Sequence, residues 1–158
     1  MIGNALRDLE LTDDETVRMH KLYRHLHANP ELSMQEHRTA RLITDHLTAI
    51  GAETFSCGGT GVVGVLRNGE GPVVGFRADI DGLPIKEETG LDYASQATGA
   101  LTDGTQVPVM HGCGHDMHIT AALTAAALLA DATDAWTGTV VFLFQPGEET
   151  AAGAQAMV

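Results

Sequence analysis

Basic residues are scarce in this chain, and their scarcity excludes several kinds of partner. The 158 residues contain 9 lysines and arginines against 21 aspartates and glutamates, which gives a formal net charge of −12. Nucleic acids and anionic membrane surfaces are bound through clustered lysine and arginine side chains. The composition therefore predicts no nucleic-acid partner and no membrane partner.

Cysteines and long apolar runs are scarce as well. Cys57 and Cys113 are too few for a disulfide scaffold, and although a single disulfide stays open, we expect a reduced, cytoplasmic protein. No segment approaches the roughly 20 apolar residues of a transmembrane helix. Residues 1–8 lack the basic start and apolar core of a signal peptide, so we expect none.

What is present is enough for one folded domain. The sequence is 44% hydrophobic and 19% charged, a balance typical of globular proteins. Its length matches the roughly 100–200 residues of a single domain. We therefore expect one domain with its own core.

Two helices are predicted in the first third. Thr12 and Glu15 have the spacing of a capping box, and apolar residues then recur along 19–26 at helical spacing. Asn29-Pro30 should end this first helix, because the residue before a proline avoids helical dihedrals.

The second helix should begin at another capping box, Ser33 and Glu36, and end at Gly51. His25 lies opposite the apolar stripe of the first helix and His27 lies on its flank. Most histidines in such positions are solvated surface groups, and histidine alone is a weak indicator of catalysis. We therefore interpret both as surface residues.

The remaining pattern predicts a layered α/β domain. Residues 92–109 are polar and loop-like, whereas three β-rich runs and one apolar, alanine-rich run should form the core. The expected strands are 61–67, 73–78 and 139–144, and the expected buried helix is 119–130. The turn-forming linker 68–72 predicts that the first two strands are a hairpin or neighbours.

The segment 110–118 concentrates groups that bind metals or move protons. It holds three histidines, one cysteine and one aspartate within nine residues, just before the predicted buried helix. A thiolate and an imidazole spaced as Cys113-x-His115 can converge on one cation, and catalytic zinc sites add a carboxylate. A small buried cysteine beside a capping histidine is the alternative for the isolated pair.

Carboxylates follow two of the predicted strands. Glu148 and Glu149 come directly after 139–144, where one could bind a metal while the other takes a proton, although acidic residues are also common in a first helical turn. Asp79 and Asp81 follow 73–78 on one side of the chain, or else form an Asp-Gly turn. Together with 110–118, these positions favour a metal-activated hydrolase.

Several motifs in order resemble those of one enzyme family. Segments 77–90, 110–118 and 144–149 look like successive signatures of the metal-dependent amidohydrolases, and 26–36 resembles the N-terminal signature. This family includes hippurate hydrolases, N-acyl-amino-acid amidohydrolases and indole-acetyl-amino-acid hydrolases, relatives of aminoacylase and the zinc carboxypeptidases. The resemblance implies an α/β fold, a zinc-peptidase-like layered catalytic domain.

The resemblance also implies roles for individual residues. Cys113, His115 and Glu149 match metal ligands, and Glu148 matches the general base that activates water and protonates the leaving amine. The implied cofactor is one or two divalent metal ions, with zinc, manganese and cobalt as candidates. The implied substrate is a small-molecule N-acyl amino acid, cleaved at its amide bond to a carboxylic acid and an amino acid.

Other implied features concern the supporting residues and the rest of the fold. Asp81 matches an aspartate kept beside the metal, and Asp79 stands where wider relatives carry a ligand histidine. Relatives add downstream histidine ligands and a lid domain that forms a homodimer. We therefore expect residues 1–158 to be the N-terminal portion of the catalytic domain, to lack the lid and dimerisation domain, and to be inactive alone.

Two other functions remain open at this point. One is a cysteine-nucleophile amidase, in which Cys113 attacks the substrate and a nearby histidine is its base. The other is a non-catalytic fragment that binds metal or a partner but turns over no substrate. Reversible inhibition by a chelator would distinguish a metalloenzyme from both.

Overall fold

The structure, a computed structural model, describes residues 11–158. The helices are α1 (Asp13–Ala28), α2 (His37–Ala49), α3 (His115–Asp131) and α4 (Gly153–Met157), with a short 3-10 turn, η2 (Thr133–Ala135). The strands are β1 (Glu53–Cys57), β2 (Gly61–Asn68), β3 (Val73–Asp79), β4 (Thr98–Ala100), β5 (Gln106–Pro108) and β6 (Gly138–Gln145). Within the described range, no helix is long and apolar enough to cross a membrane. The prediction about residues 1–8 lies outside this range.

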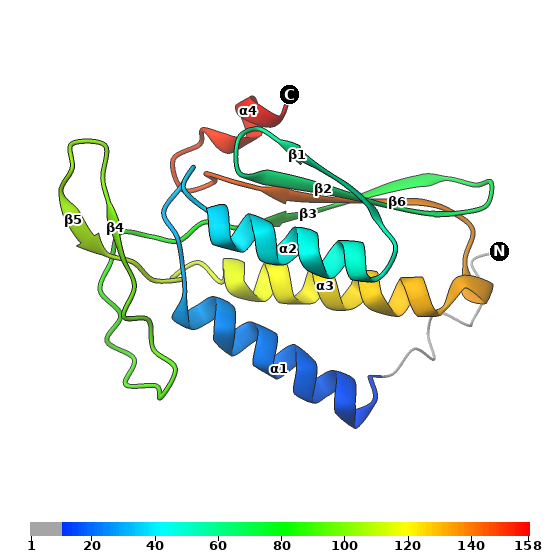
Figure 1. Cartoon of the computed structure of the whole chain (residues 1–158), viewed down its shortest axis with the longest axis horizontal. Coiled ribbons are helices and arrows are strands. Elements are labelled where there is room, and N and C mark those ends of the chain that lie inside the picture. The colour runs from blue at the N-terminus through cyan, green and yellow to red at the C-terminus, as the bar shows by residue number, and fades with distance from the viewer. Residues whose placement is uncertain (1–10) are drawn as a thin grey trace.

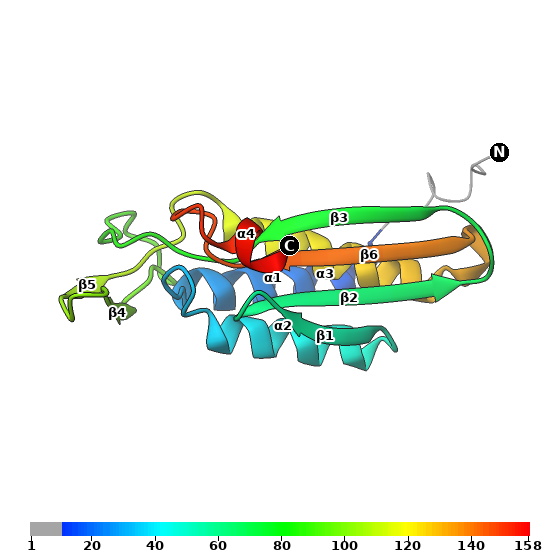
Figure 2. The same ribbon diagram turned by 90° about the horizontal axis from the view of Figure 1, so that it is seen from above.

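Four strands form one mixed sheet in the order β1-β2-β6-β3, which Figure 2 shows side by side. β6 pairs antiparallel with β2 and parallel with β3. The prediction that β2 and β3 form a hairpin or lie next to each other is therefore wrong. The linker does turn the chain, but it leaves room for β6, whose Thr139 amide donates to the Pro72 carbonyl at 2.9 Å.

The three longer helices, α1, α2 and α3, lie on one side of this sheet (Figure 1). Figure 1 shows α2 and α3 against the strands, with α1 packed outside α3, while α4 lies on the other side near the C-terminus. The core forms where α2 and α3 meet the sheet. Its fully buried side chains include Ile43, Leu47, Ile119, Phe142 and Phe144. This arrangement confirms the predicted layered α/β class.

The two N-terminal helices differ in how well their starts were predicted. The Thr12–Glu15 capping box is present, and α1 ends at Ala28, next to Asn29. The second capping box is wrong, because α2 begins at His37 and its start has no side-chain cap. The two expected capping groups make tertiary contacts instead.

Those contacts tie the start of α2 to distant segments. Ser33 donates to the carboxylate of Asp81 at 2.6 Å. Glu36 is fully buried and accepts from the backbone amides of Met34 at 2.9 Å and Gly147 at 2.8 Å. A carboxylate used in this way cannot also cap a helix.

The structure also differs from the prediction in where α3 begins and in three short strands that were not predicted. β6 confirms the apolar run 139–144, and α3 begins at His115, four residues before the expected start. The sequence did not indicate β1, nor the β4–β5 pair within 92–109, which projects from the body in Figure 1. These strands are short and largely exposed, so they carry little apolar periodicity.

A glycine in β2 permits the close packing of α2 on the sheet. A Cβ atom at Gly64 would lie 2.7 Å from Cδ1 of Leu47, whose side chain is fully buried and cannot move aside. We expect Gly64→Ala to lower the free energy of unfolding by about 1–3 kcal/mol, the usual cost of overpacking. Urea unfolding followed by circular dichroism measures this.

Gly75 in β3 is the matched control for that substitution. A Cβ atom there would meet nothing within 4 Å. Gly75→Ala should therefore be neutral or stabilising by up to about 1 kcal/mol. Equal destabilisation by both substitutions would contradict the packing argument.

Candidate metal centre

The acidic groups gather at one edge of the sheet. β3 and β6 are parallel, so their carboxyl ends meet at the same edge. Asp79 and Asp81 leave β3 there, and Glu148 and Glu149 follow β6. His115, the first residue of α3, reaches the same place and lies 3.3 Å from Asp81. Ligand sites in α/β sheets lie at such edges.

Two glycines shape the loops that carry these groups. Gly114 adopts a left-handed conformation, φ 80°, as the N-cap of α3, and so allows a sharp turn between Cys113 and His115. Gly147 has φ 54°, and a Cβ atom there would lie 2.7 Å from the sulfur of Met34. Side chains at these positions would therefore deform both loops.

His115 is oriented by Asp81. Its Nδ1 donates to the Asp81 carbonyl at 2.9 Å and lies 3.3 Å from the Asp81 carboxylate. Burial lowers the pKa of His115, but the bonds to Asp81 outweigh it and raise the pKa to about 9. The other nitrogen, Nε2, lies 3.8 Å from Glu148. Carboxylates that hydrogen-bond to the other nitrogen of a metal-binding histidine orient its ring in this way.

Asp81 connects three distant parts of the chain. It is almost fully buried and accepts hydrogen bonds from Ser33 at 2.6 Å and from the Glu149 amide at 3.0 Å, besides its contact with His115. Burial raises the pKa of Asp81, but these bonds lower it overall. The carboxylate therefore stays ionised and holds the site together.

Three of the predicted site residues, two ligands and the base, form a cluster that suits a divalent cation. Ligand atoms of His115, Glu148 and Glu149 all lie within 4.8 Å of one another. Oε1 of Glu149 is buried without a hydrogen-bond partner among residues 11–158. A cation would satisfy this oxygen, and one imidazole, one thiol and a carboxylate are donors that zinc accepts.

The exposed thiol of Cys113 is not part of that three-residue cluster but lies next to Glu149. Its hydrogen bond to Glu149, burial and the nearby carboxylates of Glu148 and Asp81 raise the pKa of the thiol to about 11. A nucleophilic cysteine needs the opposite, a cationic neighbour that lowers its pKa. This environment disfavours the cysteine-nucleophile alternative, and a cation placed among these groups would favour the thiolate.

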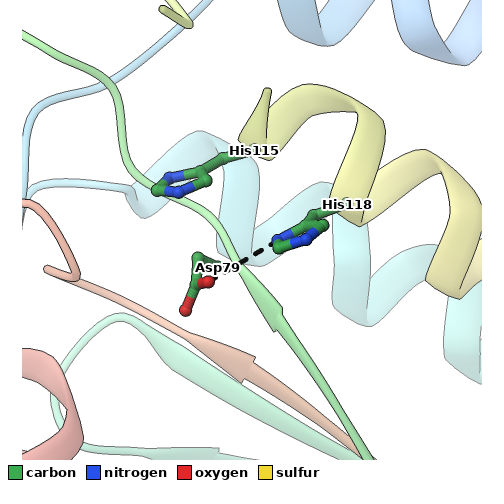
Figure 3. A group of neighbouring side chains, drawn as sticks. All are labelled: Asp79, His115 and His118. Carbon is green, nitrogen blue, oxygen red and sulfur yellow. Dashed lines mark ion pairs between the residues drawn. The ribbon is translucent and has the colours of Figure 1, made fainter. Parts of the chain in front are cut away.

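A second cluster lies beside the first. Figure 3 shows Asp79 below His115 and His118, whose rings stack with centroids 5.8 Å apart. Oδ2 of Asp79 lies 3.5 Å from Nδ1 of His118 and 3.2 Å from the guanidinium of Arg77. The other carboxylate oxygen of Asp79, Oδ1, is buried without a hydrogen-bond partner among residues 11–158, so this cluster also offers donors for a cation.

Two other polar residues of the segment 110–118, His111 and Asp116, lie outside both clusters. His111 is buried, its two ring nitrogens have no partner in the described part of the chain, and burial lowers its pKa to about 4. Asp116 turns toward α1 and contacts His27 at 2.7 Å.

The surface interpretation of His27 is wrong. Its side chain is only 6% exposed and lies between the carboxylates of Asp116 and Glu87. The sequence carried a signal for this position: His27 follows Tyr23 by four residues, so the apolar stripe extended by one turn includes it. His25, by contrast, is exposed as expected.

The fold and the site define a layered α/β domain with a metal-type ligand cluster at one sheet edge. The profile of the peptidase family M20/M25/M40 matches residues 75–158, just over half of the chain. The chain belongs to this family, which confirms the resemblance.

Individual relatives agree with that assignment. N-acetyl-L-cysteine deacetylase of Bacillus subtilis is 43% identical over 137 residues, which cover 85% of this chain and 31% of the relative. Hippurate hydrolase of Campylobacter jejuni is 41% identical over 140 residues, covering 87% and 34%. The chain thus spans about a third of these relatives, and the predicted domain division stays a prediction.

A solved structure shows the same fold. The Bacillus subtilis YXEP protein, described as a dinuclear metal-binding peptidase of the M20 family, superposes with a TM-score of 0.81 at 37% identity. The match covers 92% of this chain and 39% of that one.

Proposed function

We propose that the protein is a metal-dependent amidohydrolase that cleaves the amide bond of N-acyl amino acids. The observation that carries the proposal is the convergence of His115, Glu148 and Glu149 beyond the ends of β3 and β6, with the Cys113 thiol next to Glu149. Relatives named for the hydrolysis of hippurate and N-acetyl-L-cysteine support this class of substrate.

Three of these residues are proposed metal ligands, and the fourth is the proposed base. Cys113, His115 and Glu149 would hold a divalent cation, because a thiol, an imidazole and a carboxylate are donors that zinc accepts. Zinc, manganese and cobalt are the candidates. A bound cation supplies Lewis-acid polarisation of the carbonyl and lowers the pKa of water.

Glu148 is the proposed general base. It is half-exposed, with 41% of its side chain accessible, so substrate and water can reach it. Its carboxylate would take a proton from the attacking water and return it to the nitrogen of the leaving amino acid. The balanced reaction adds one water and releases a carboxylic acid and an amino acid. Free thiols at Cys57 and Cys113 are compatible with the cytoplasmic location that we propose.

Chelation tests the proposal on the whole protein. We expect turnover of hippurate or N-acetyl-L-cysteine to fall more than roughly 100-fold after metal removal and to return on addition of zinc, manganese or cobalt, because the metal stabilises the developing charge. Amino-acid release is the measurement. Full turnover in the metal-free protein would exclude a metalloenzyme.

A matched experiment addresses the non-catalytic alternative. A protein that binds metal stoichiometrically, as measured by elemental analysis, and yet releases no amino acid from either substrate would support a binding fragment. Turnover that follows metal content would exclude it.

A further inference from the structure

We infer that His27 is a positioning residue for the metal-ligand turn 113–116, which it fixes by bridging two buried carboxylates as a cation. The inference rests on the proposed function, because His27 affects metal binding only if Cys113 and His115 of this turn are metal ligands. Its geometry, however, stands by itself. His27 comes from α1, Asp116 from α3, and Glu87 from the irregular segment between β3 and β4.

The hydrogen bonds define the charge of His27. Nδ1 lies 2.7 Å from Asp116 and Nε2 lies 3.0 Å from Glu87. Each ring nitrogen therefore has a carboxylate oxygen as its partner, and an imidazole with protons on both nitrogens can donate to both carboxylates. Burial lowers the pKa of His27, but the two carboxylates outweigh it and raise the pKa. The trio then holds one cation and two anions.

The other charged and titratable groups around His27 leave this assignment intact. The rings of Tyr23 and Tyr93 lie 5.6 and 5.2 Å from the imidazole, and Arg24 stacks over Tyr93 at 4.9 Å, outside the trio. His111, the remaining group on this side, has its pKa lowered to about 4 and so is neutral. No other cation among residues 11–158 contacts the two carboxylates.

Each carboxylate of the trio is itself fixed in place. Glu87 accepts from Thr89 and from the Ser95 amide at 2.6 Å, which anchors the segment between β3 and β4. Asp116 accepts from the Met117 amide at 2.8 Å in the first turn of α3. His27 therefore joins a loop on one side to the start of α3 on the other.

This link matters because Asp116 directly follows His115. Without the imidazolium, the two buried carboxylates would repel each other with no cation between them. Entry of water or movement of the turn would then have to reduce this repulsion. Movement of Asp116 would carry His115 and Cys113 with it. Loss of residues that orient metal ligands usually weakens metal binding roughly 10–100-fold.

The test compares His27→Gln with a control on the same helix, His20→Gln, which changes an exposed histidine. The first readout needs no metal: amide hydrogen exchange at Met117 and His118, whose amides both donate to the Gly114 carbonyl at 3.0 Å. We expect exchange there to become roughly tenfold faster in His27→Gln only. Leu123, in the middle of α3, should be unaffected.

The second readout is cobalt(II) titration, followed by the thiolate-to-cobalt absorption band. We expect the dissociation constant to rise roughly 10–100-fold in His27→Gln, with a weakened band, and to stay unchanged in His20→Gln. A purely structural role would lower stability without altering the band of the folded protein.

A charge-matched double variant keeps the inference testable if His27→Gln does not fold. His27→Gln with Glu87→Gln restores the single net negative charge of the native trio, and its two amides can still bridge to Asp116. We expect it to recover the cobalt band and to bind within roughly threefold of the wild type. A double variant as weak as the single one would overturn the bridging role.

The remaining outcomes separate the two proposals. Unchanged exchange at Met117 and His118 in His27→Gln, or equal acceleration throughout α1 and α3, would overturn the inference whatever the metal result. A wild type that shows no thiolate–cobalt band would overturn the proposed function instead. In that case, amide hydrogen exchange alone tests whether His27 positions the turn.

Discussion

Replacing Glu148 by glutamine is expected to lower kcat for N-acyl amino acids by at least roughly 100-fold while metal stays bound. The substitution removes the proton acceptor and keeps the shape of the side chain. General acid–base groups usually contribute roughly 10²–10⁴-fold. The measurement pairs steady-state kinetics with elemental analysis of the same samples of whole protein.

Glu149→Gln is the matched control, since it makes the same chemical change one residue later. We expect it to lose metal as well as turnover, because Oε1 of Glu149 is one of the buried carboxylate oxygens that lack a hydrogen-bond partner in the described part of the chain. If both variants lost equal amounts of metal, the division into base and ligand would be wrong.

Cys113→Ser is expected to weaken divalent-metal binding by more than roughly 100-fold. A serine hydroxyl is a poor ligand at neutral pH, and the softer sulfur is preferred by zinc. Even changes in residues that merely orient ligands cost roughly 10–100-fold, so the loss of a ligand should exceed that range. Metal content and competition with a coloured chelator measure the effect.

Cys57→Ser is the control for sulfur chemistry in general. Cys57 lies at the end of β1, where its thiol contacts the Met157 carbonyl at 3.5 Å, away from the ligand group. We expect normal metal content in this variant. Unchanged metal content in Cys113→Ser would show that the thiol is not a ligand.

The sequence was most informative where residues that can bind a metal lie at the ends of predicted helices and strands. Cys113, His115 and the glutamate pair each lie at an element end, and ends of parallel strands must share an edge, so their proximity could be foreseen. The strand order could not. Nothing local distinguishes β6 inserted between β2 and β3 from a simple hairpin, because that choice depends on long-range pairing.

The sequence also did not predict which polar side chains are buried. His27 and Glu36 look like surface residues by type, since charged and polar groups are mostly exposed. Both are buried because partners far along the chain compensate them: Asp116 and Glu87 for His27, Gly147 among others for Glu36. Local periodicity contains no information about such partners.

The position of β6 in the middle of the sheet has a consequence for biosynthesis. The ribosome makes β2 and β3 first, but the strand that both of them pair with emerges only at residues 138–145. Until then one side of β2, the side along which Val62 and Leu66 are paired with β6, has no strand to accept or donate its backbone hydrogen bonds. The nascent chain therefore passes through an interval in which chaperone binding and proteolysis compete with folding.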